Sequence, residues 1–182
     1  MTNKNKTFSV YRVTVLALLI AAVQTSRLLF SFLPNVQPVT VLLILILLTF
    51  GYVDALIVGT GAIVVSNLYL GMGPWTLSQI FAYGVVVSVS FALSVVLGRF
   101  RKILFFWVIY AIIAGFLYGL VISIFHALLY GLTFQAFLAY WIAGLWFDGY
   151  HAIGNGGFML ILYPVLLPLF EKMSLKIKTS QS

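Results

Sequence analysis

The sequence contains no cysteine, and only three of its 182 residues are Asp or Glu. Without cysteine the chain has no disulfide, no thiolate metal site and no cysteine nucleophile. Charged residues of both signs together make up 7% of the chain, whereas a soluble domain carries about 25%. So few charges cannot cover a water-exposed surface. A cytosolic enzyme, a secreted domain and a nucleic-acid-binding protein are therefore excluded.

The motifs that would supply energy or catalysis are also missing. The chain has no G-x-x-x-x-G-K-[ST] sequence to hold ATP phosphates and no H-E-x-x-H sequence to hold zinc. Its few acidic residues leave no carboxylate pair for general acid–base catalysis and no row of acids for a proton relay. We therefore predict a non-catalytic protein, with no catalytic residue, metal site or cofactor of its own, that depends on partner proteins for energy.

Hydrophobic residues, by contrast, make up 63% of the chain, and the mean hydropathy is +1.16. These values predict an all-α integral membrane protein, with residues 1–182 as a single transmembrane domain. A helix needs about 20 residues to cross a bilayer. The apolar runs, divided by Gly, Pro and charged positions, predict six transmembrane helices at about 10–31, 39–50, 53–70, 75–98, 103–130 and 151–171.

The basic residues set the predicted orientation. All but Arg27 fall into three groups: Lys4, Lys6 and Arg12; Arg99, Arg101 and Lys102; and Lys172, Lys176 and Lys178. Short segments rich in Lys and Arg stay in the cytoplasm. Keeping all three groups there requires a cytoplasmic turn near Asp54 and both termini in the cytoplasm.

Two apolar runs are too short for an ordinary crossing. In this topology residues 134–147 form an outer interfacial or re-entrant segment between the fifth and sixth helices, within an outer loop at 131–150. The helix at 39–50 has only 12 positions, so we expect it to extend into its flanks.

Most polar residues at membrane depth lie toward the outer face in this topology. Such groups are costly there and are usually functional. Together with the Trp and Tyr residues beside them, they predict a concave small-molecule site. The substrate-binding candidates are Arg27, Asn35, Gln37, Asn67, Trp75, Gln79, Tyr83, Trp141, Trp146, Asp148, His151 and Asn155.

Other interpretations of these residues stay open. An aromatic belt at the lipid headgroups, with loop-capping amides, would use the same side chains. Arg27 either extends to the membrane interface, pairs with Asp148, or meets an anionic group of a ligand. His126, alone in the helix at 103–130, is interpreted as a packed histidine.

The inner half of the first helix carries a spacing that favours helix association. Ala17 and Ala21 are four positions apart, and small residues at this spacing let another helix approach closely. We therefore expect this face to dock a partner helix.

Three stretches of the sequence are similar to a known family. They are Pro34-Asn35-Val36-Gln37-Pro38-Val39-Thr40; Ser66-Asn67-Leu68-Tyr69-Leu70-Gly71-Met72-Gly73-Pro74-Trp75-Thr76 with Gln79; and Phe147-Asp148 with His151-Ala152-Ile153-Gly154-Asn155. With the two alanines, the chain resembles the substrate-binding S components of energy-coupling factor (ECF) vitamin transporters over about residues 10–172. The second stretch is the most specific.

The resemblance implies a multi-pass protein of the bacterial cytoplasmic membrane that captures a vitamin at its outer face. It implies docking through Ala17 and Ala21 onto a membrane T component that carries two cytoplasmic ATPases, followed by toppling of the S component in the bilayer. The chain looks most like the cobalamin-specific members, in which case Arg27 would meet the phosphodiester of vitamin B12. Pantothenate, folate, riboflavin and biotin are the alternative ligands.

Two other classes compete with this interpretation. A six-helix structural scaffold would need no ligand, and its outer amides would only cap loops. An intramembrane enzyme would need a serine and a histidine, but no serine stands in a recognisable nucleophile motif.

Overall fold

The structure is a computed structural model, and it describes residues 10–179 apart from the side chain at position 178. Lys4 and Lys6, which belong to the predicted N-terminal basic group, lie outside these residues. The described elements are α1 (Val10–Leu29), α2 (Val39–Phe50), α3 (Tyr52–Leu70), α4 (Pro74–Leu97), the short 3-10 helix η1 (Gly98–Phe100), α5 (Leu104–Tyr130) and α6 (Phe134–Thr179).

Apart from short connections, the described part of the chain is helical, and it contains no strand. Five of its helices are long and apolar enough to cross a membrane, and α2 is the shorter apolar one. The predicted all-helical fold is thereby confirmed, and the five apolar helices are consistent with a multi-pass membrane protein. The helix boundaries follow local breakers: Gly51, which separates α2 from α3, has a φ of 105°, a conformation that suits glycine.

Two predictions about the elements are wrong. The helix at 39–50 does not extend into its flanks, because Pro38 precedes it and Gly51 ends it. Residues 134–147 are not a separate segment, and 131–150 is not a loop: α6 is one helix of 46 residues that includes the predicted helix at 151–171. A glycine in a helix interior is only about 1 kcal/mol less favourable than an alanine, so Gly149 does not interrupt α6.

The short α2 forms the centre of the bundle. Every residue from Val39 to Leu47 is buried, and α2 contacts all five other α-helices. A helix that is hydrophobic on all sides is stable when it is surrounded. The other helices keep large apolar side chains exposed, such as Val96 and Ile161, as expected of surfaces that face lipid.

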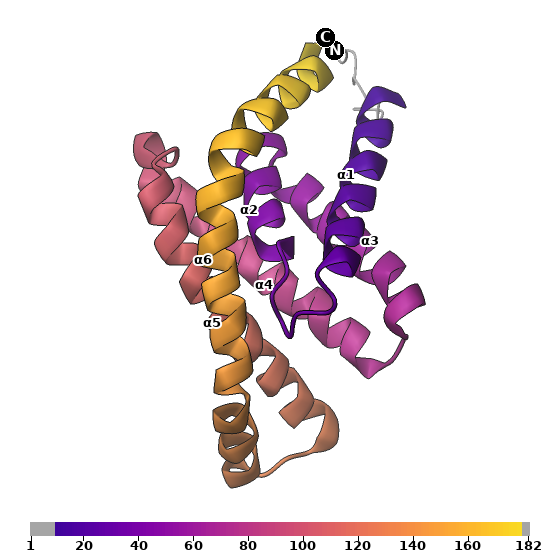
Figure 1. Cartoon of the computed structure of the whole chain (residues 1–182), viewed down its shortest axis with the longest axis vertical. Coiled ribbons are helices and arrows are strands. Elements are labelled where there is room, and N and C mark those ends of the chain that lie inside the picture. The colour runs from indigo at the N-terminus through magenta and orange to yellow at the C-terminus, as the bar shows by residue number, and fades with distance from the viewer. Residues whose placement is uncertain (1–9, 180–182) are drawn as a thin grey trace, which may run out of the picture.

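Both ends of the described chain lie at the same end of the molecule (Figure 1). Two ion pairs connect elements there: Arg12 of α1 pairs with Asp54 of α3, and Lys102 pairs with Glu171 of α6 at 2.7 Å. We call this the basic end, defined by Arg12, Lys102 and Glu171. The Arg99–Lys102 connection between α4 and α5 also belongs to it, so the described basic residues of all three groups gather on one side.

Candidate functional site

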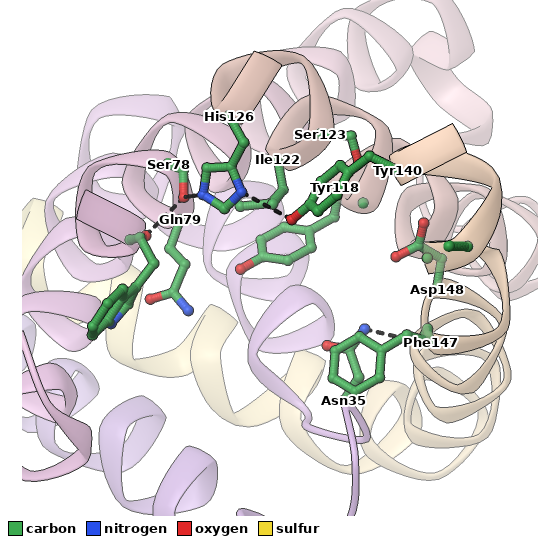
Figure 2. A pocket seen from close by; sticks show the side chains of 14 residues that line it. Asn35, Ser78, Gln79, Tyr118, Ile122, Ser123, His126, Tyr140, Phe147 and Asp148 are labelled. Carbon is green, nitrogen blue, oxygen red and sulfur yellow. Dashed lines mark hydrogen bonds between the residues drawn. The ribbon is translucent and has the colours of Figure 1, made fainter. Parts of the chain in front are cut away.

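A cavity of about 450 Å³ lies between α4, α5 and α6, at the ends of these helices that are far from the basic end (Figure 2). Its size falls within the range of small-molecule sites, roughly 300–1,000 Å³. Its walls are mainly aromatic, neutral polar and small, with one acid and one isoleucine. They comprise Asn35, Trp75, Ser78, Gln79, Tyr118, Gly119, Ile122, Ser123, His126, Tyr140, Ala143, Gly144, Phe147 and Asp148.

Four predicted site residues line this cavity: Asn35, Trp75, Gln79 and Asp148. Asn35 lies in the loop before α2, and its Nδ2 donates a hydrogen bond to the Phe147 carbonyl oxygen at 2.9 Å. That bond fastens the loop to α6 at the edge of the cavity.

Arg27 and Asn67 do not line the cavity but hold Gln79, which does. Arg27 is buried and donates hydrogen bonds to Ser66, to Asn67 Oδ1 at 2.8 Å and to Gln79 Oε1 at 3.2 Å. Asn67 Nδ2 donates to Gln79 Oε1 at 2.9 Å and to Thr76 Oγ1 at 2.8 Å. These bonds connect α1, α3 and α4 beside the cavity.

This arrangement decides between the interpretations of Arg27. Its guanidinium neither extends to an exposed interface nor forms an ion pair with Asp148; within residues 10–179 the ion pairs are Arg12–Asp54 and Lys102–Glu171. Arg27 is also absent from the cavity walls. Its role in the structure is to position neutral side chains.

Tyr83 and His151 lie behind the aromatic wall rather than in it. The Tyr83 ring lies 4.6 Å from the Tyr118 ring, and the His151 ring meets Tyr118 edge-on at 5.0 Å. His151 Nε2 is 3.0 Å from Thr40 Oγ1, which connects α6 to α2. These contacts fix the position of Tyr118 in the cavity.

The remaining predicted site residues are placed elsewhere. Asn155 is fully buried and donates to the Ala111 carbonyl oxygen at 3.2 Å. Trp141 stacks on Phe137, with ring centroids 6.3 Å apart. Trp146 is exposed, and Gln37 is half-buried in the loop before α2 without reaching the cavity.

His126 is a cavity residue, which corrects its interpretation as a packed histidine. Its Nε2 lies 3.3 Å from Ser78 Oγ, and its Nδ1 lies 3.0 Å from Tyr140 OH. The resulting chain of polar groups crosses from α4 through α5 to α6, as Figure 2 shows. It gives one wall of the cavity a continuous line of donors and acceptors.

Sequence reasoning missed the whole α5 wall. Its residues are 118, 119, 122, 123 and 126, which repeat at the spacing that places side chains on one face of a helix. A similar stripe on α6 holds 140, 143, 144, 147 and 148. These two stripes of polar, small and aromatic residues are the sequence signal from which the α5 and α6 walls of the cavity could have been predicted.

The cavity can hold a small organic molecule through ring contacts, neutral hydrogen bonds and the Asp148 carboxylate. In the part of the chain that the structure describes, no group of three His, Asp or Glu residues is arranged to hold a metal ion. Comparisons with protein-family models, curated proteins and solved structures found no match to the chain.

Proposed function

We propose that the chain is the substrate-binding S component of an ECF-type vitamin importer in the bacterial cytoplasmic membrane. In this proposal six transmembrane helices place both termini in the cytoplasm. The chain captures its vitamin at the outer face and delivers it by toppling against a T component. Two cytoplasmic ATPases supply the energy.

The observation that carries the proposal is the position of the cavity. It lies at the ends of α4, α5 and α6 that are opposite the basic end. Because basic loops stay in the cytoplasm, the cavity would then open toward the outside. A hydrogen-bonding, aromatic cavity at that end suits the capture of a vitamin.

The surface of α1 supports docking of a partner helix. Ala17 and Ala21 are exposed, whereas Val15, Leu19 and Val23 face the core. Small residues on the free face would let a T component approach the α1 backbone.

Cobalamin is the favoured ligand because the cavity walls are mainly aromatic and neutral, which suits an amide-rich molecule. A cavity of about 450 Å³ would hold part of a corrinoid, with the remainder in its mouth. Smaller vitamins would fit inside it completely. Since Arg27 is engaged with Ser66, Asn67 and Gln79, contact between Arg27 and the phosphodiester is not part of this proposal.

The test is to purify the chain in detergent and titrate cobalamin, riboflavin, folate, pantothenate and biotin by calorimetry. We expect one-to-one binding of cobalamin, weakened at least tenfold, on the order of 1.4 kcal/mol, by Tyr140→Ala. Tyr140 lines the cavity, whereas Tyr69, also an exposed tyrosine, does not. Tyr69→Ala is therefore the matched control.

Each other outcome has a distinct meaning. Binding of a different vitamin would keep the S-component proposal and replace the ligand. No binding of any vitamin, together with no co-purification of a T component and ATPases, would overturn the proposal in favour of a structural scaffold.

A further inference from the structure

Asp148 carries the only acidic side chain in the cavity wall, and it has no partner in the described chain. The residue is buried, with 6% of its surface exposed. No other side chain or backbone group within residues 10–179 forms a hydrogen bond or ion pair with its carboxylate. Figure 2 shows the carboxylate turned toward the cavity.

The backbone of α5 makes room for this carboxylate. A Cβ atom on Gly119 would lie 1.9 Å from Asp148 Oδ1 and 2.1 Å from Oδ2. Any side chain at position 119 would therefore displace the acid. The absence of a side chain at Gly119 lets the carboxylate lie against α5 while it still faces the cavity.

No Lys or Arg lines the cavity to neutralise this acid. The buried cation Arg27 is engaged by Ser66, Asn67 and Gln79. A buried carboxylate without a partner is unfavourable, and a donor or a positive charge supplied from outside relieves that cost. The rings of Tyr118, Tyr140 and Phe147 in the same walls also suit a positively polarised nitrogen.

We propose that Asp148 determines the ligand class of this site: the bound molecule presents a cationic or N–H donor nitrogen to the carboxylate, and a ligand carboxylate is refused there. The inference rests on the proposed function and narrows it. An amide-rich vitamin meets the requirement, whereas pantothenate, folate and biotin would have to keep their carboxylates away from Asp148.

The test compares ligands that differ only in an amide and a carboxylate, by calorimetry on the full chain in detergent. The pairs are cobalamin with its monocarboxylic acids, each with one side-chain amide hydrolysed, and biotinamide with biotin. For the pair that binds, we expect the wild-type chain to bind the amide form about tenfold or more tightly than the carboxylate form. This is the value of a hydrogen bond to a charged group. Asp148→Asn should reduce that preference to about threefold or less.

Two further variants keep the test decisive. Glu171→Gln makes the same acid-to-amide change at the basic end, where Glu171 pairs with Lys102, and should leave the preference unchanged. Gly119→Ala keeps the acid but displaces it, so it should lower the preference even where Asp148→Asn fails to fold.

The outcomes separate this inference from the proposed function. If cobalamin or another vitamin binds but neither Asp148→Asn nor Gly119→Ala changes the preference, the inference is overturned while vitamin capture stands. If the wild-type chain prefers the carboxylate of the bound pair, the inference is likewise overturned. If no vitamin binds to the folded wild-type chain, this inference is overturned, and the proposed function fails as well when neither a T component nor ATPases co-purify.

Discussion

The side-chain amide of Asn35 donates a hydrogen bond to the carbonyl oxygen of Phe147, 112 positions later in the chain. This bond holds the loop between α1 and α2 against α6 at the edge of the cavity. Asn35 also has a positive φ of 58°, a conformation that Asn adopts more readily than most residues.

Two substitutions at Asn35 separate these roles. Asn35→Gly keeps the backbone conformation and removes the hydrogen bond, so ligand affinity should fall about fivefold, close to the value of one ordinary hydrogen bond. Asn35→Ala also strains the backbone and should lower the free energy of unfolding by about 1 kcal/mol more than the glycine variant. Titration and thermal unfolding in detergent measure the two effects, and equal values for both variants would contradict the assigned strain.

Replacement of Arg27 should destabilise the fold and weaken ligand binding. Arg27→Met leaves the acceptor oxygens of Asn67 and Gln79 with fewer donors in a buried region, which should cost about 1–3 kcal/mol of unfolding free energy. Binding should weaken as well, because Gln79 lines the cavity. Thermal unfolding and titration of the same preparation give both numbers.

Arg99→Met is the control for that experiment. Arg99 is exposed and lies over the Phe100 ring at the basic end, 4.8 Å from its centroid. Its loss should change the unfolding free energy by about 0.5 kcal/mol or less. If the two arginine variants unfolded alike, the buried network around Arg27 would not have the stabilising role assigned to it.

The close contact between α5 and α6 depends on Gly115. A Cβ atom there would lie 2.6 Å from the backbone N and Cα of Ala152, so Gly115→Ala must move the two helices apart. We expect a loss of about 1–3 kcal/mol in unfolding free energy. Gly157→Ala, in α6 with nothing within 4 Å of its new atom, should be neutral or stabilising by up to about 1 kcal/mol. Thermal unfolding distinguishes the two, and similar midpoints would refute the close approach.

The proposed docking face makes a different prediction, because it separates transport from binding. Ala17→Leu combined with Ala21→Leu should abolish uptake into vesicles that contain the T component and ATPases, while vitamin affinity stays within about twofold. Ala92→Leu changes an exposed alanine on α4 and should leave uptake unchanged. Normal uptake by the double variant would exclude the docking role, and loss of binding would place the site or a weak point of the fold on α1.

Local sequence signals were sufficient for most helix boundaries. Gly51, Gly71 and Gly131 follow the last residues of α2, α3 and α5, and each stands directly after an apolar run. The continuity of α6 had no such signal. Asp148 and Gly149 resemble a break in the sequence, but the cost of one glycine is small, and this part of α6 packs closely against α5 at Gly115 and Gly119.

The candidate site was harder to predict because it depends on how each helix is rotated about its axis. Asn67 and Gln79 share a hydrogen bond, yet only Gln79 reaches the cavity. His126 stands alone in its apolar segment and was therefore interpreted as a packed histidine, whereas its partners, Ser78 and Tyr140, come from other helices. A polar residue in an apolar segment can be recognised from sequence, whereas the surface it faces is set by tertiary packing.

The length of α6 has a mechanical consequence. At 1.5 Å per residue its 46 residues measure about 69 Å along the helix path, whereas the hydrocarbon core of a bilayer is about 30 Å thick. Even with a strong tilt, a helix of this length must project beyond the lipid tails. Pro164 and Pro168 lie between Asp148 and the Lys102–Glu171 pair, and each leaves one helical carbonyl without its usual donor. α6 therefore has two prolines between the cavity wall and the basic end, and bending at these prolines would change the angle between its two parts.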